Sequence, residues 1–276
     1  MLSVLIIVAA FFISILFVMR FRPAPPPDRI GVVSCIKNPK NIDTWLKLHR
    51  DLGVSRFYIR LEDTPELINF FESQPDVHLV VADSKSADEY LDLMGRQSRM
   101  VDMSLELCKK DGIDWLIHID CDEVLEGDLN EIRNLPKGVG TFWMQNYEVM
   151  YDKIPTNSDN CFIGSKFVDC SKDVCASYAN GKGGGRVAVS QANGPHRFRS
   201  PLKEVKLGSV IVKHFESCDF DQYIAKYKRL AKSDVSSIPF QYYKESIQAD
   251  GDVDKLGKIY EKYRVNSSYV KSSGSD

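Results

Sequence analysis

Beyond residue 28 the chain alternates short runs of hydrophobic residues with segments in which hydrophobic positions recur at helical spacing. The short runs are rich in Val, Ile and aromatic residues, and they predict strands over residues 30–36, 54–59, 77–81 and 115–119. Strands that alternate with helices in this way are typical of a mostly parallel sheet covered on both faces. The pattern therefore predicts an α/β fold, with a mixed, mostly parallel sheet flanked by helices.

The segments between these strands carry helix start and stop signals. In the first of them Trp45, Leu48 and Leu52 share one stripe, and Gly53 follows in a stop position. After residue 139 the pattern changes to short strands rich in Gly, Asn and aromatic residues, which end with a strand over residues 210–213. Helices are expected over residues 41–52, from residue 64, over residues 87–110 and from residue 219.

Residues 1–19 carry no charged side chain and are almost entirely apolar. At about 1.5 Å of rise per residue, a helix of this length nearly spans the hydrocarbon layer of a bilayer. We therefore expect a transmembrane anchor. A cleaved signal peptide is the alternative, but the segment lacks a basic start and a small-x-small cleavage site. Arg20 and Arg22 follow the apolar run and favour a cytosolic position for the remainder of the chain.

The expected organisation is a single globular domain behind this anchor. A proline-rich spacer holds the domain off the bilayer, and a helical tail with a disordered end follows the domain. The boundaries are residues 1–19 for the anchor, 20–29 for the spacer, 30–232 for the domain and 233–276 for the tail.

Composition narrows the choice of partners. The 276 residues are 43% hydrophobic and 27% charged, which excludes collagen, coiled coil and general disorder. The formal net charge is -2, so no global basic field is present and no nucleic-acid partner is expected. The 7 cysteines are too sparse for a disulfide scaffold, and their odd number leaves at least one without a partner in this chain.

The strongest chemical signal is the acidic pair that ends the strand over residues 115–119, namely Asp120 and Asp122. Open α/β sheets bind ligands at the carboxyl ends of their strands. Side chains two positions apart in an extended chain point the same way, so the two carboxylates can share one Mn²⁺ or Mg²⁺ ion. Other Asp-x-Asp pairs begin at residues 219, 250 and 252, where we expect helix-start or surface acids.

The same acids also fit a phosphatase motif. Asp120-x-Asp122-x-Val124-Leu125 matches the signature of haloacid-dehalogenase-type phosphatases, in which the first Asp attacks phosphorus. That fold carries the motif on its first core strand, whereas about three β/α units precede it here. A phosphatase that uses Asp120 is therefore the less favoured alternative.

Four ordered blocks surround the acidic pair and point to a family. They are residues 34–38 with 45–50 and 52–59; Gln97 with 114–124; residues 178–182 with Arg186 and 194–198; and residues 212–215 with Tyr223 and Lys226. Together they resemble the GT-A glycosyltransferases of the family 2 and family 92 type, especially the membrane-anchored group of plants, animals and large viruses. The chain departs from the family's pattern in two loops. Pro39 stands where an acidic residue is usual, and Leu61-Glu62-Asp63 replaces an aromatic-Asp-Asn sequence.

The resemblance implies a GT-A (Rossmann-like) fold and a metal-dependent transfer of a sugar. The donor would be a nucleotide-diphosphate sugar, and the acceptor a hydroxyl of a glycan or glycoprotein. The family's metal motif corresponds to Asp120 and Asp122, with Mn²⁺ or Mg²⁺ as the cofactor and His214 as a third ligand. Asp120 could instead contact the ribose, His196 competes with His214, and His214 could be a hydrogen-bonded core residue. A non-catalytic sugar-binding relative is the main alternative function.

The same resemblance implies the remaining site residues. Lys182 and Arg186 belong to a glycine-rich segment, expected to be a loop that approaches phosphates or else a flexible turn. For Arg96 and Gln97 the alternative is an ordinary polar helix surface. The expected nucleotide-sugar contacts are Lys37, Asp63, Arg96, Gln97, Asp120, Lys182, Arg186 and His196.

The sequence gives fewer indications of the residues that bind and activate the acceptor. An inverting transferase needs a carboxylate base, and Glu148 and Asp152 are the nearest candidates in chain order. Trp143 and Tyr147 could stack on an acceptor sugar, although aromatic residues in a strand are more often core residues.

The orientation in the membrane has arguments on both sides. The resemblance implies a single-pass protein with its domain in the Golgi lumen. A cysteine cluster formed by Cys161, Cys170 and Cys175, and a glycosylation sequon at Asn266, suit a lumenal compartment. Arg20 and Arg22 favour the cytosolic orientation.

Overall fold

A computed structural model describes residues 27–85, 89–155, 160–162, 166–170, 175–231, 235–236, 238 and 240–265. The predicted anchor over residues 1–19, most of the spacer, the sequon and the end expected to be disordered lie outside these residues. In the part of the chain that the structure describes, every helix is too short or too polar to cross a membrane.

The centre of the fold is a seven-stranded sheet in the order β12-β6-β9-β4-β1-β2-β3. The pairs β1–β2, β1–β4, β2–β3 and β6–β12 are parallel, whereas β9 is antiparallel to both of its neighbours. The prediction of a mixed, mostly parallel sheet is therefore confirmed. The strands are β1 (Ile30–Ile36), β2 (Arg56–Glu62), β3 (Val77–Ala82), β4 (Trp115–His118), β6 (Val139–Met144), β9 (Lys182–Arg186) and β12 (Lys203–Lys206).

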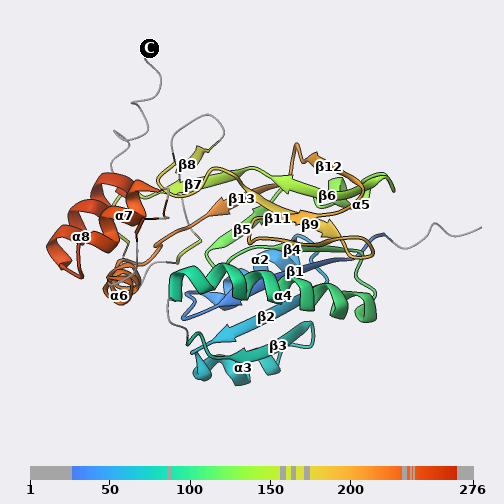
Figure 1. Ribbon diagram of the computed structural model, residues 1–276, viewed down its shortest axis with the longest axis horizontal. Coiled ribbons are helices and arrows are strands. Elements are labelled where there is room, and N and C mark those ends of the chain that lie inside the picture. The colour runs from blue at the N-terminus through green and yellow to red at the C-terminus, as the bar shows by residue number, and fades with distance from the viewer. Residues whose placement is uncertain are drawn as a thin grey trace, which may run out of the picture.

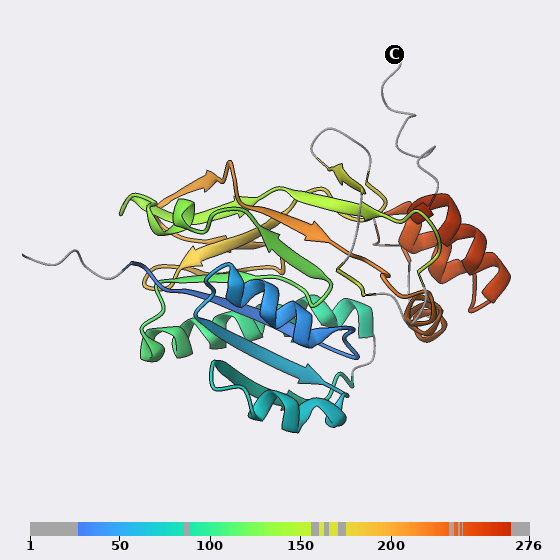
Figure 2. The same cartoon turned by 180° about the vertical axis from the view of Figure 1, so that it is seen from behind.

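Helices cover both faces of this sheet, as the alternating pattern predicted. Helix α4 (Glu89–Asp111) crosses one face (Figure 1), and α2 (Ile42–Asp51) lies on the opposite face (Figure 2). The side chains of β1 alternate between the two layers: Val32 packs in one hydrophobic cluster with Trp45 of α2, and Val33 packs in a second cluster with Met100 of α4. The sheet is thus buried on both faces, which explains the continuous apolar runs in the sequence.

Shorter helical segments connect the strands. The start signal at Thr64 corresponds to a 3₁₀ turn η1 (Pro65–Leu67) that continues into α3 (Ile68–Glu72). Helix α5 (Asn130–Arg133) precedes β6.

A smaller four-stranded sheet lies beside the central one, in the order β5-β13-β7-β8. Strand β13 pairs in parallel with β7 and antiparallel with β5. The strands of this sheet are β5 (Glu123–Glu126), β7 (Asn146–Met150), β8 (Lys166–Asp169) and β13 (Ile211–His214), and a separate hairpin joins β10 (Gln191–Asn193) to β11 (Arg197–Arg199).

The glycine-rich segment is a buried strand and not the loop that we expected. Strand β9 needs small residues because its neighbours approach it closely. A Cβ atom on Gly184 would lie 2.4 Å from Cζ of Phe142, and one on Gly185 would lie 2.6 Å from the Ser190 side chain. Glycine has a low strand propensity, so local preference does not explain this strand. The glycines are required because the neighbouring chains leave no space for a larger side chain.

The C-terminal helices gather at one end of the molecule (Figure 1). They are α6 (Phe220–Leu230), α7 (Gln241–Gln248), α8 (Val253–Tyr260) and a π-helical turn η2 (Glu261–Val265). The side chains of Asp219 and Asp252 cap α6 and α8, which confirms both as helix-start acids. Tyr242 and Tyr260 are fully buried in the hydrophobic cluster that also contains Trp45, so α7 and α8 pack against the same core as α2.

Candidate functional site

Four strands bring polar side chains to one edge of the molecule. Asp120 and Asp122 follow the carboxyl end of β4. Strand β9 runs antiparallel to β4, so its first residue, Lys182, lies at the same edge. His214 is the last residue of β13, and β13 pairs with β5, which begins at Glu123. Residues distant in sequence therefore meet at the strand ends where α/β proteins bind ligands.

Asp120 is held by two side chains and by its own backbone. One carboxylate oxygen lies 2.5 Å from the Nζ atom of Lys182, and the other accepts a hydrogen bond of 2.7 Å from Gln97. The backbone N–H of Asp120 donates to Oε2 of Glu123 at 2.7 Å. Glu123 also lies 3.3 Å from Lys182 and accepts a hydrogen bond from the hydroxyl of Tyr178. These contacts fix the Asp120 carboxylate in one orientation.

The charges of this cluster compensate one another. Burial opposes the charged form of Lys182, but Asp120 and Glu123 outweigh burial and raise the pKa of its ammonium. Burial also opposes ionisation of Asp120, but Lys182 outweighs it and lowers the pKa of the carboxyl. Burial raises the pKa of Glu123. The site therefore contains a fixed positive charge, fully shielded from solvent, next to the first acid of the pair.

Asp122 faces His214. Nε2 of His214 lies 3.7 Å from Oδ2 of Asp122, while Nδ1 lies 3.1 Å from the hydroxyl of Ser177 and 3.7 Å from Oε1 of Glu148. Burial lowers the affinity of the imidazole for a proton, but Asp122 and Glu148 outweigh burial and raise the pKa of His214 to about 10. The ring thus lies in a strongly negative environment that favours a cation.

The donor set at Asp122 and His214 fits a divalent metal ion. A separation of 3.7 Å is too long for a hydrogen bond. Two ligands of one ion at about 2.1 Å from it are themselves about 3 to 4 Å apart. Metal-binding histidines usually have a carboxylate or another hydrogen-bond partner at the second ring nitrogen, as Glu148 and Ser177 provide here. Because both oxygens of Asp120 already contact Lys182 and Gln97, Asp122 is the better placed acid of the pair.

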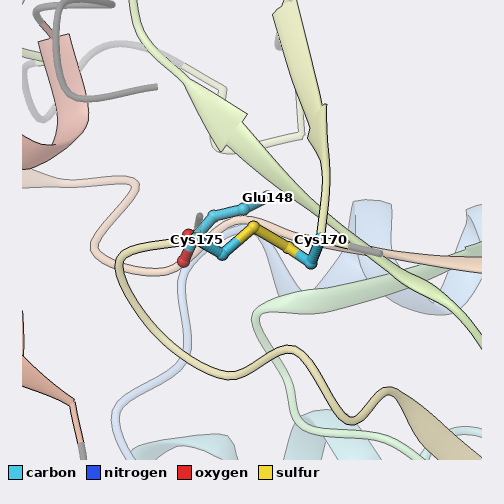
Figure 3. Close-up of side chains that lie close together, drawn as sticks. All are labelled: Glu148, Cys170 and Cys175. Atoms are coloured by element: carbon cyan, nitrogen blue, oxygen red, sulfur yellow. A yellow bond between two sulfur atoms is a disulfide. The ribbon is translucent and has the colours of Figure 1, made fainter. Parts of the chain in front are cut away.

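A second group of potential metal ligands is excluded by its chemistry. Ligand atoms of Glu148, Cys170 and Cys175 lie within 4.8 Å of one another (Figure 3). The two sulfur atoms are bonded to each other, however, so neither is available as a thiolate ligand. This disulfide instead anchors the segment that begins at Cys175, whose next two backbone N–H groups, those of Ala176 and Ser177, donate to Glu148 at 2.7 and 3.4 Å.

Two further histidines lie near Lys182. Nδ1 of His196 lies 2.9 Å from the carbonyl oxygen of Gly181, and burial lowers the pKa of His196 to about 3. Nδ1 of His118 lies 2.6 Å from the carbonyl oxygen of Pro195, and burial lowers the pKa of His118 to about 4. The Nε2 atom of His118 is buried without a hydrogen-bond partner. Both rings are neutral and line the side of the site next to Lys182.

Two of the predicted nucleotide contacts, Lys37 and Asp63, directly follow β1 and β2 at this edge. Lys37 lies 2.9 Å from Asp63 and donates to Ser84 at 2.8 Å. Arg96 is 6% exposed and pairs with Glu62 at 2.9 Å, so the alternative of an ordinary helix surface is wrong for Arg96.

Other predicted residues lie elsewhere. Arg186 is at the far end of β9, opposite the first residue of β4, where it stacks 4.2 Å from the Trp115 ring and donates to the carbonyl of Val139. The structure therefore does not bring Arg186 to Asp120, because Arg186 is the last residue of the five-residue strand that begins at that edge with Lys182. The side chain of Asp152 is 61% exposed and pairs with Lys166 at 2.8 Å.

The two predicted acceptor residues are engaged with neighbours. The indole of Trp143 contacts Arg197 and Lys206, whose charged groups lie 4.8 and 4.7 Å from the ring. The hydroxyl of Tyr147 donates to Asp169 at 3.2 Å. Neither residue contacts the acidic pair through these interactions.

Four site residues had no role in the sequence-based prediction: Glu123, Ser177, Tyr178 and Arg264. Glu123 and Tyr178 fall inside the blocks that carry the family resemblance, so the third carboxylate directly after the acidic pair was a usable signal. Nothing in the local sequence indicates Arg264. It belongs to the C-terminal turn η2, and it pairs with Glu148 at 2.8 Å.

Comparison with known proteins supports one class of function at low identity. No family model matches the chain. It is 23% identical over 237 residues to a protein of Arabidopsis thaliana named Glycosyltransferase-like At3g57200. The alignment covers 67% of this chain and 46% of the relative. It is 22% identical over 206 residues to Glycosyltransferase-like At2g41451 from the same plant, covering 56% of this chain and 46% of that protein. The chain thus spans about half the length of the curated relatives that it matches.

Solved structures give a weaker comparison. The crystal structure of Rv0371c from Mycobacterium tuberculosis in complex with manganese aligns with a TM-score of 0.28 and 10% identity, over 44% of this chain and 66% of that chain. A TM-score this low does not establish a common fold.

Proposed function

We propose that this chain is a metal-dependent glycosyltransferase that moves a sugar from a nucleotide-diphosphate donor to a hydroxyl of a glycan or glycoprotein. The observation that carries the proposal is the meeting of Asp120, Asp122, Lys182 and His214 at the ligand-binding edge of the sheet. The two plant relatives named glycosyltransferase-like support the same class.

The roles follow from the contacts. Asp122 and His214 would hold Mn²⁺ or Mg²⁺, and a bound ion of this kind neutralises negative charge that builds up on a departing diphosphate. Lys182 supplies a second, fixed positive charge beside Asp120, and Gln97 orients the Asp120 carboxylate. Lys37, Asp63, Arg96 and His196 would contact the nucleotide part of the donor.

Glu148 fits a role behind His214 better than that of the base that deprotonates the acceptor. It is 1% exposed, and although burial opposes its ionisation, Arg264 and His214 lower its pKa to about 2. A carboxylate this acidic is a weak base at neutral pH. We therefore assign Glu148 to the orientation of the imidazole.

We also propose that the domain faces an oxidising compartment such as the Golgi lumen. Two disulfides, Cys161–Cys218 and Cys170–Cys175, support this location, because such bonds are rare in the cytosol. Expression of the full chain in eukaryotic cells tests the orientation through Asn266. A glycan on Asn266 requires the lumen, whereas an unmodified Asn266 with reduced cysteines would overturn this location.

The function is tested by calorimetry with the full chain and a panel of nucleotide-sugars, with and without Mn²⁺. One donor is expected to bind only when Mn²⁺ is present, and Asp122→Asn or His214→Gln is expected to abolish that binding. Asp254→Asn is the matched control, because Asp254 belongs to a surface Asp-x-Asp pair at the start of α8. Its binding should equal that of the unmodified chain.

The outcomes separate the rival functions. Donor binding without sugar transfer to any acceptor would indicate the non-catalytic relative. A phosphorylated Asp120 after incubation with phosphate esters would indicate the phosphatase. If no donor binds with or without Mn²⁺, the transferase proposal is wrong.

A further inference from the structure

The C-terminal turn η2 sends one charged side chain into the interior. Arg264 is 0% exposed. Its backbone carbonyl accepts a hydrogen bond of 2.8 Å from the N–H of Tyr151, which directly follows β7, and one guanidinium nitrogen donates to the carbonyl oxygen of Glu216 at 2.8 Å. The guanidinium lies 5.8 Å from the ring of Tyr242. These contacts hold the charged group at a defined position in the core.

The partner of this guanidinium is Glu148 on β7. The Nη1 atom of Arg264 lies 2.8 Å from Oε1 of Glu148. Both side chains are almost fully buried, and a buried carboxylate needs a cation or several hydrogen-bond donors to stay ionised. Among the described residues, the ion pairs of Glu148 are with Arg264 and His214. Arginine stays charged at any physiological pH, so it is the permanent counter-charge of the two.

Glu148 in turn faces the second nitrogen of the His214 ring. Its Oε1 atom lies 3.7 Å from Nδ1 of His214, and the hydroxyl of Ser177 bridges the two by donating to Oε1 and lying 3.1 Å from Nδ1. With Nδ1 held in this way, Nε2 is left facing Asp122 at 3.7 Å. A continuous line of contacts therefore connects Arg264 to the two residues suited to hold a metal ion.

We propose that Arg264 is a positioning residue of the metal site, acting through Glu148 on the orientation of the His214 ring. This inference rests on the proposed function, because it takes Asp122 and His214 as the metal ligands. It makes the C-terminal helical segment part of the site and not an appendage. Partners behind metal-binding histidines typically change metal affinity by about 10- to 100-fold.

The test is a double-mutant cycle on Mn²⁺ affinity, measured by calorimetry on the full chain without donor. Arg264→Met and Glu148→Gln should each weaken Mn²⁺ binding by about 10- to 100-fold. The double variant should bind no more weakly than Glu148→Gln alone, because both changes remove the same influence on His214. Arg264→Lys, which keeps the charge, should restore most of the affinity.

Lys262→Met is the matched control. It removes a positive charge from the same turn, but Lys262 pairs with Glu245 at 3.0 Å and its side chain is 50% exposed. Its Mn²⁺ affinity should equal that of the unmodified chain. Circular dichroism and thermal unfolding show which variants fold. If Arg264→Met does not fold, the double variant, which leaves no unpaired buried charge, still tests the route through Glu148: Mn²⁺ binding weaker than in Glu148→Gln would overturn it.

An unchanged affinity in folded Arg264→Met, or losses that multiply in the double variant, would overturn the positioning role. If the unmodified chain binds no Mn²⁺, the proposed function fails, and the ring ¹⁵N signals of His214 test the positioning role without metal. Those signals, assigned with His214→Gln, should shift in Arg264→Met and stay in place in Lys262→Met. Signals that stay in place in both variants would refute it.

Discussion

The ammonium of Lys182 lies 2.5 Å from the carboxylate of Asp120, and the Lys182 side chain is completely shielded from solvent. An acid in this position is usually considered as a metal ligand, but here it already has a cationic partner from another strand. The two acids of the pair therefore have different surroundings: Asp120 faces Lys182 and Gln97, and Asp122 faces His214. The site therefore contains a positive charge of its own, supplied by Lys182.

Replacement of Lys182 by methionine should strongly destabilise the protein. The change leaves Asp120 and Glu123 without their shared cation, and loss of one partner from a buried ion pair costs about 3 to 5 kcal/mol. Urea unfolding of Lys182→Met measures this loss. Lys47→Met is the control, since Lys47 and Asp51 form an exposed pair worth less than about 1 kcal/mol. Similar losses in both variants would contradict the role of Lys182.

An alanine at position 184 should not fit into the central sheet. The added Cβ would lie 2.4 Å from Phe142 and 2.9 Å from the carbonyl oxygen of Leu116, so strands must move apart. The expected loss in the free energy of unfolding is about 1 to 3 kcal/mol. Gly138→Ala is the control, because nothing lies within 4 Å of a Cβ there. At Gly138 the change should be neutral or slightly stabilising, because alanine lowers the entropy of the unfolded chain. An equal loss at Gly138 would show that the lack of space around Gly184 does not set the cost.

Stability should decrease below neutral pH because of His49. Its Nε2 accepts the N–H of Leu125 at 3.1 Å while its Nδ1 lies 2.8 Å from the carbonyl of Trp45, an arrangement that suits the neutral ring. Burial lowers the pKa of His49 from 6.5 to about 4. Between these values the unfolded chain binds a proton that the folded protein does not, so the stabilisation is complete above pH 6.5 and lost as the pH falls towards 4.

The loss from His49 amounts to about 3 kcal/mol by pH 4. Urea unfolding across this range should show a smaller pH slope in His49→Gln than in the unmodified chain. The slope should not vanish in His49→Gln, because burial lowers the pKa of His118 and of His196 in the same direction. An identical slope in the unmodified chain and in His49→Gln would refute the assignment.

The two disulfides should differ in their contributions to stability. Cys161–Cys218 closes a loop of 57 residues, and loop-closure entropy gives it about 4 kcal/mol, whereas Cys170–Cys175, with a separation of 5, contributes about 2 kcal/mol. Paired serine substitutions and urea unfolding measure both contributions.

Removal of Cys170–Cys175 should also weaken Mn²⁺ binding, although this bond contributes less to stability, because it anchors the segment that carries Ser177. Unchanged Mn²⁺ affinity without this bond would contradict that view.

The first half of the fold could be predicted from the sequence because its signals are local. Strand β1 has the predicted bounds, and the predicted strand before Asp120 is β4 with one residue fewer. A parallel sheet buried on both faces produces continuous apolar runs, and an acid directly after such a run must lie at the carboxyl edge. The placement of Asp120 and Asp122 follows from this rule alone.

The second half depends on contacts between distant segments. The glycines of β9 resemble a loop in the sequence, and only the approach of Phe142 and Ser190 explains them as a strand. The same error led to the prediction that Arg186 lies beside Lys182. In the structure the two residues are at opposite ends of strand β9. Arg264 could not be predicted as a site residue, because its partner Glu148 is 116 positions away in the numbering and no local pattern connects them.

The position of β9 also determines the order in which the sheet can form during synthesis. Strands β1 to β4 leave the ribosome first and can pair with one another through nearby connections. Strands β4 and β6 are not hydrogen-bonded to each other in the finished order, and the edge of each that faces β9 stays open until residues 182–186 arrive between them. An open edge of a buried-type strand is a template for pairing with other chains. The nascent protein therefore exposes both of these edges in the interval between β6 and β9, and the late glycine strand closes the two at once. The outer edge of β6 stays open until β12 pairs with it.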